Sequence, residues 1–164
     1  MSTSFTPAEA RHAVELLASR ALIRLVTEID DNGAIPPRRL AGTLPDLSTH
    51  HLRSASDTAR AHGLVRVAPG AALELTEAGK ELAELYHSVA RWARRHAVPA
   101  PVSEFSSRIR HVLNLLTASL TPDSAAHPAS AAAGTGLAHP RTLLIQWLAG
   151  NPQVVRVPEP ESAA

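Results

Sequence analysis

The chain has 164 residues, of which 45% are hydrophobic, and its formal net charge is only +1. This length and composition suit one globular domain with some additional tail. The absence of cysteine excludes disulfides and thiolate chemistry. No apolar run approaches the roughly 18 residues of a transmembrane helix, and the N-terminal residues lack the apolar core of a signal peptide, so we expect a cytoplasmic protein.

The first predicted element is helical. Thr6 and Pro7 form a typical helix start, and Gly33 suits a left-handed helix end. Apolar residues follow at helical steps of three and four, namely Val14, Leu17, Ala21, Leu25 and Ile29. The pattern fits one long helix or two shorter ones, because Ser19-Arg20 is able to interrupt it.

A helix-turn-helix pattern follows. Pro36-Pro37 opens a short helix that ends near Leu44-Pro45, and residues 46–48 form a turn. Ser48 is a good N-cap for a third helix that runs to about His62 and is closed by Gly63.

A hairpin and a long helix come next. Residues 64–67 and 73–75 alternate as strands around a tight turn at 69–72. Thr76 then caps a long amphipathic helix. Its expected buried stripe is Leu82, Leu85, Val89, Trp92 and His96. The order predicts a mainly α fold, a winged helix-turn-helix with a two-stranded wing, over residues 1–98.

The remaining residues predict additional C-terminal elements. After a break at 98–101, residues 103–120 form a helix. Domain 99–120 is interpreted as a dimerisation helix, and the N-terminal helix is expected to form the dimer interface with it, because both carry more apolar surface than a small winged domain needs. Its stripe is Phe105, Ile109, Val112 or Leu113, Leu116 and Leu120. Residues 121–138, small and nearly uncharged, predict a flexible linker. Residues 139–164 predict a short helix after Pro140, docked through its apolar face on the dimer helices, and a disordered tail from Asn151.

The third helix carries the predicted DNA-reading face. Leu52, Ala55 and Ala59 face inward, which leaves polar side chains of the length needed to reach base edges on the other side. Arg38 and Arg39, at the start of the preceding helix, are placed to hold phosphates. The complete set of predicted DNA-binding residues is Arg38, Arg39, Ser48, Thr49, His50, Arg53, Ser54, Asp57 and Arg66.

The distribution of charge supports this interpretation. Residues 36–96 hold nine Arg or Lys against six Asp or Glu, whereas residues 1–35 hold three against five. A solvated helix face is the competing explanation.

The stretch from Arg38 to His96 resembles the HxlR-type winged-helix regulators, which are related to the MarR regulators. The resemblance rests on RRLAGTLPDLS, Leu52 in the third helix, GLV at the strand start, the LT-x-x-G-x-x-L motif from Leu75 to Leu82, and Trp92 followed by basic residues. It implies a dimeric bacterial transcription factor that binds double-stranded DNA and has no catalytic activity.

Other kinds of site have weaker support. The nine histidines show no pair at the i, i+3 or i+4 spacing of a helical metal site, and no catalytic motif is present, so we expect neither metal nor cofactor. Tyr86, Trp92 and Phe105 fit an ordinary core better than an effector pocket.

The leading hypothesis is therefore a homodimeric, sequence-specific transcriptional regulator. One alternative is a winged-helix protein-interaction module without DNA binding, which the uncharged turn at 69–72 favours. A small enzyme is a more distant alternative.

Overall fold

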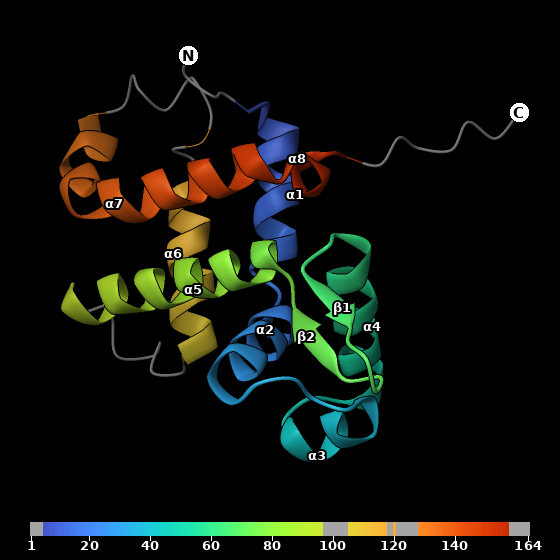
Figure 1. Ribbon diagram of the computed structural model, residues 1–164. Helices are drawn as coiled ribbons and strands as arrows, with labels where there is room; N and C mark the ends of the chain where they lie inside the picture. Colours follow the sequence, from blue (N-terminus) through green and yellow to red (C-terminus); the bar gives the residue numbers. More distant parts are fainter. Residues whose placement is uncertain (1–4, 97–104, 118–119, 121–127, 158–164) are drawn as a thin grey trace, which may run out of the picture.

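A computed structural model describes residues 5–96, 105–117, 120 and 128–157, and for residues 128–136 it describes the backbone alone. The protein is mainly helical, with one two-stranded antiparallel sheet (Figure 1).

The N-terminal residues form two helices. In α1 (Pro7–Leu17) the Thr6 hydroxyl accepts from the Glu9 N–H, and the Glu9 carboxylate accepts from the Thr6 N–H, a complete capping box. Ser19 caps α2 (Arg20–Asn32) by accepting from the N–H of Leu22. Of the two arrangements that the sequence allowed, the interrupted one is therefore correct.

The next elements confirm the helix, turn, helix order. A 3-10 turn (Pro37–Arg39) leads into α3 (Leu40–Thr43), and α4 (Thr49–Ala61) begins after the N-cap Ser48. Leu52, Ala55 and Ala59 are buried on the inner side of α4, as expected.

The hairpin is short. Strands β1 (Val65–Val67) and β2 (Leu73–Leu75) pair antiparallel with Arg66 opposite Glu74. Ile35, between α2 and α3, forms a further bridge to Leu73. The connecting turn places Gly70 and Ala71 at positive φ, which confirms the predicted tight turn.

Helix α5 (Glu77–Arg95) begins after its N-cap Thr76, as predicted. Leu82, Leu85 and Val89 are buried, Trp92 is half-buried, and His96 is exposed and stacks on Trp92. Part of the expected stripe is thus buried, but its C-terminal end is not.

Helix α6 (Phe105–Thr117) packs within its own chain. Its apolar stripe contacts α1, α2 and α5, and Ile109, Val112, Leu113 and Leu116 are buried. The apolar residues of α1 and α2 are buried within the chain in the same way. These stripes are not available to a second subunit, so the expectation that the N-terminal helix and α6 form a dimer interface through them is wrong. The expected helix start at 103–104 lies outside the described residues.

Two C-terminal expectations are also wrong. Helix α7 (Pro128–Gly150) includes residues 128–138, expected as linker, and contains Pro140 in its interior. Alanine is the best helix former, and buried Leu137, Pro140 and Leu144 anchor the helix, so packing outweighs the proline penalty. The expected tail from Asn151 begins with a short helix, α8 (Pro152–Val155). Residues 121–127 and 158–164 of those segments lie outside the described part.

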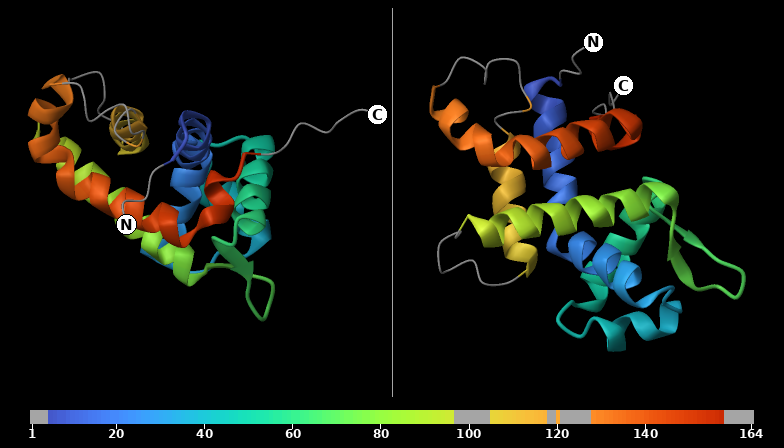
Figure 2. Two further views of the ribbon diagram at one scale, coloured as in Figure 1. Left: turned by 90° about the horizontal axis from the view of Figure 1, so that it is seen from above. Right: turned by 60° about the vertical axis from the view of Figure 1, so that its left-hand side comes forward.

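The helices form two layers. Helices α5 and α7 run side by side across α1, α2 and α6, whereas α3, α4 and the hairpin gather at the opposite end from the C-terminus of α5 (Figures 1 and 2). Within the described residues, no helix is both long and apolar enough to cross a membrane.

Candidate nucleic-acid interface

Helix α4 presents a polar outer face. Thr49, His50, Arg53 and Asp57 are exposed there, with Arg60 one turn further on. None of the charged groups on this face has a hydrogen-bond or ion-pair partner among the described residues. All nine residues predicted to bind DNA are exposed. The face therefore offers donors and acceptors to an external partner.

Ser48 is already engaged within the helix start. Its hydroxyl accepts from the His51 N–H at 3.1 Å and pairs with His51 Nδ1 at 2.9 Å. These two contacts use the hydroxyl as a cap, so Ser48 fixes the beginning of α4 instead of presenting a free group.

An ion-pair cluster that the sequence did not reveal fixes α4 relative to α2. The Arg24 guanidinium donates two hydrogen bonds of 3.1 Å to the Asp46 carboxylate, and Arg20 Nη2 lies 2.9 Å from the same carboxylate. The hydrogen bond from Arg24 is the main reason that the pKa of Asp46 lies below its ordinary 3.8. Asp46 lies in the turn between α3 and α4, so the cluster sets the position of both helices. Arg24 and Arg20 precede Asp46 by 22 and 26 positions, so local sequence spacing does not indicate that these residues meet.

Arg38 and Arg39 lie in the turn before α3, and both are exposed without a partner among the described residues. The turn that carries them contacts α3, and α3 contacts α4; α3 and α4 lie at the same end of the molecule (Figure 1). Two cations beside a polar helix face suit contacts to phosphate.

The hairpin contributes less than expected. Arg66 Nε donates to Glu74 Oε1 at 2.6 Å, an ion pair across the two strands. The turn at residues 69–72 carries no charge. The cation predicted to contact DNA is therefore partly neutralised by its own hairpin.

The basic excess of residues 36–96 does not lie at α4. The excess of three positive charges equals the number of arginines in the last turns of α5, Arg91, Arg94 and Arg95. Without these three, the segment holds six basic and six acidic residues. These three residues are at the C-terminal end of α5, far from α4 (Figure 1). The charge argument made from the sequence therefore does not support α4 as the electrostatic footprint.

One edge of the polar face borders a hollow of about 350 Å³ between α1, α2 and α4. Ser54 and His51 line it from α4, facing His12 and Glu15 of α1. Ser54 thus lies at the margin of the outer face.

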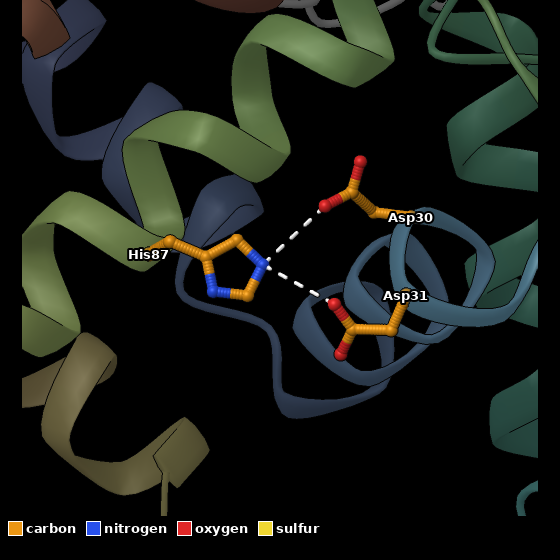
Figure 3. Close-up of side chains that lie close together, drawn as sticks. All are labelled: Asp30, Asp31 and His87. Carbon is orange, nitrogen blue, oxygen red and sulfur yellow. Dashed lines mark ion pairs between the residues drawn. The ribbon is translucent and has the colours of Figure 1, made fainter.

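Asp30, Asp31 and His87 form a separate cluster. His87 Nε2 of α5 lies 3.4 Å from Asp30 Oδ2 and 3.6 Å from Asp31 Oδ1, at the end of α2 (Figure 3). The three ligand atoms lie within 4.8 Å of one another, close enough to share a divalent cation. Protonated His87 satisfies the same geometry as an ion pair. Sequence spacing does not indicate this cluster, because its members come from two helices.

Helix α8 contacts the C-terminal end of α4, and α7 contacts the start of α5. Gln153 Nε2 of α8 donates to the carbonyl of His62, the C-cap of α4, at 3.0 Å. Trp147 of α7 donates its indole N–H to the carbonyl of Ala78, at the start of α5, at 3.0 Å. The end of α4 is therefore tied to the C-terminal helices.

Comparisons with protein-family models, curated proteins and solved structures found no match to this chain. The function is accordingly argued from the site itself.

Proposed function

We propose that this protein is a winged-helix DNA-binding transcriptional regulator of the HxlR and MarR kind. The order of its elements supports the proposal: α2, the Ile35 bridge, α3, α4, then the β1–β2 hairpin. In winged-helix proteins this order places the second helix of the helix-turn-helix in the major groove.

The single observation that carries the proposal is the outer face of α4. A free Arg53 lies between Thr49 and Asp57 on one exposed surface. Arginine binds guanine through two hydrogen bonds, and a carboxylate accepts from the amino group of cytosine. The ion pairs of Asp46 tie the turn before this helix to α2, and a fixed position favours sequence readout. Arg38 and Arg39 would bind phosphates beside it.

Residues 36–84 hold equal numbers of basic and acidic residues, which predicts that non-specific DNA binding is weak. Non-specific affinity depends on the number of phosphates neutralised, and few cations are available here. We therefore expect weak binding to random DNA and a shallow dependence of affinity on salt.

The experiment compares variants on two DNA pools: duplexes selected from a random library by the wild-type protein, and the unselected library. Arg53→Ala should lose about 1–3 kcal/mol of binding free energy on selected duplexes and much less on the library. Arg39→Ala should weaken binding to both by a similar factor. Arg11→Ala, an exposed arginine on α1, is the matched control and should change neither. Equal losses for Arg53→Ala on both pools would contradict base reading.

A second candidate is a winged-helix module that binds a protein partner. The uncharged turn, the Arg66–Glu74 ion pair and the carboxylate of Asp57 amid the outer face favour it. Failure of the wild-type protein to enrich any duplex would leave this candidate in place of DNA binding.

The regulator would act as a homodimer on two half-sites. Since the stripe of α6 is buried within one chain, the dimer would have to use other surfaces.

A further inference from the structure

A cavity of about 280 Å³ lies between the C-terminal end of α5 and the middle of α7. That end of α5 lies away from α4 (Figure 1). The α5 residues that line it recur at helical steps and form one face of the helix. The lining residues are Ser88, Arg91, Trp92, Arg95 and His96 of α5, with His139 and Pro140 of α7.

The cavity is positively charged. Arg91 and Arg95 are exposed and have no ion-pair or hydrogen-bond partner among the described residues. None of the lining residues is acidic. The preceding carboxylate on α5 is Glu84, four residues before Ser88, and between residues 85 and 157 the sequence holds only Glu104 and Asp123, both outside the described part. The C-terminus of α5 carries about half a negative charge from its dipole, which is too little to balance two guanidinium groups.

The same wall is aromatic. The rings of Trp92 and His96 stack with centroids 4.3 Å apart and planes inclined by 15°. Trp92 Nε1 is buried and has no hydrogen-bond partner within the part of the chain that the structure describes. A buried donor without a partner is unfavourable, so such a group calls for an explanation at the site where it occurs.

We propose that this cavity binds a small organic anion. Arg91 and Arg95 would hold its carboxylate or phosphate, and its flat apolar part would lie against Trp92. The size of the cavity limits the ligand to about one or two rings, near the lower end for small-molecule sites. The proposal does not depend on DNA binding, because the cavity is remote from α4.

The test uses the two indole N–H signals of the ¹⁵N-labelled full chain, whose only tryptophans are Trp92 and Trp147. Benzoate should shift the Trp92 signal saturably. The Trp147 signal should not move, because its N–H is bonded to Ala78. Benzamide, which has the ring without the charge, should bind at least about tenfold more weakly, as loss of one charge-assisted bond implies. Inorganic phosphate, which has charge without a ring, should also bind more weakly.

Variants locate the anion. Arg91→Gln and Arg95→Gln should each weaken benzoate binding about tenfold. Arg94→Gln is the matched control, an exposed arginine of the same turn that does not line the cavity. Equal affinities for benzoate and benzamide, or equal effects of Arg94→Gln and Arg95→Gln, would overturn the proposal. So would a Trp92 signal that does not respond to benzoate at tens of millimolar. If inorganic phosphate bound as tightly as benzoate, the ring would contribute nothing to binding, and the proposal of an organic ligand would be wrong.

Discussion

Gly79, in the first turn of α5, lies directly against the start of β1. A Cβ at this position would collide with the carbonyl oxygen of Leu64, which also accepts the N–H of Thr76. Backbone cannot move aside as a flexible side chain can. The glycine of the LT-x-x-G motif is therefore required by the approach of strand and helix.

We predict that Gly79→Ala lowers the free energy of unfolding by about 1–3 kcal/mol, the usual cost of overpacking. Urea denaturation followed by circular dichroism measures it. Gly42→Ala is the control, because a Cβ there meets nothing within 4 Å, and alanine should slightly stabilise α3. A Gly79→Ala variant as stable as wild type would show that β1 and α5 are not held so closely.

Asp46 is the residue-scale link between α2 and the turn before α4. Asp46→Asn removes the charge that Arg20 and Arg24 share, and should cost about 1 kcal/mol of stability at pH 7. The control is Glu81→Gln, an exposed carboxylate on α5 without a partner among the described residues.

The pH dependence of that difference follows from the sign of the shift. The pKa of Asp46 is lower in the folded protein than its ordinary 3.8. Its contribution is therefore complete above pH 3.8 and is lost as pH falls through the folded value. Unfolding curves of wild type and Asp46→Asn should converge in acid. A difference that persists unchanged at pH 2 would mean that the charge is not what stabilises the turn.

Helix starts could be predicted from the sequence because the groups that make them are neighbours. Thr6, Ser48 and Thr76 each cap a helix through a contact within three residues. The Asp46 cluster and the Asp30, Asp31, His87 group could not be predicted, since their members meet only after the chain has folded. The exposed residues of α4 could thus be predicted from the sequence, whereas the ion pairs that connect the turn before α4 to α2 could not.

At the scale of elements, α7 shows where local propensity is insufficient. The segment 128–138 is poor in large apolar residues, and Pro140 ordinarily ends a helix. Its helical state depends on packing against α5, which is a property of the assembled fold. The sequence predicts that an apolar face of Leu143, Leu144, Trp147 and Leu148 docks on the dimer helices. The last three are buried as predicted, whereas Leu143 is only half-buried, and the helix packs on α5 of the same chain.

Fluorescence tests this docking in solution. In a Trp92→Phe variant, Trp147 should emit at blue-shifted wavelengths and be poorly quenched by acrylamide, because only 5% of its surface is exposed. In the reciprocal Trp147→Phe variant, half-buried Trp92 should be quenched more strongly. Emission from Trp147 like that of free tryptophan would mean that α7 is not docked.

At the scale of the whole molecule, α6 and α7 complete the core instead of forming a separate dimerisation unit. Both pack on α5, and Leu113, Leu116 and Leu144 have almost no exposed surface. The chain cannot be divided after α5 without uncovering apolar side chains.

We therefore predict that a chain ending at Val98 does not give folded monomers. It should lose cooperative thermal unfolding and bind a dye that reports exposed apolar surface. A chain ending at Val157 retains every described element and should unfold like the full protein. Cooperative melting of the shorter chain at the wild-type temperature would restore the idea of an independent N-terminal domain.

The contact between α1 and α8 brings together segments from distant parts of the sequence. During translation, α1 leaves the ribosome long before α6 and α8, which cover its buried side. Its apolar residues stay uncovered until α6 and α8 have been synthesised, and such exposed surface favours aggregation or chaperone binding. The polar face of α4 is synthesised before α8, so the carbonyl at its C-terminal end acquires Gln153 as a partner only after residue 153 has left the ribosome.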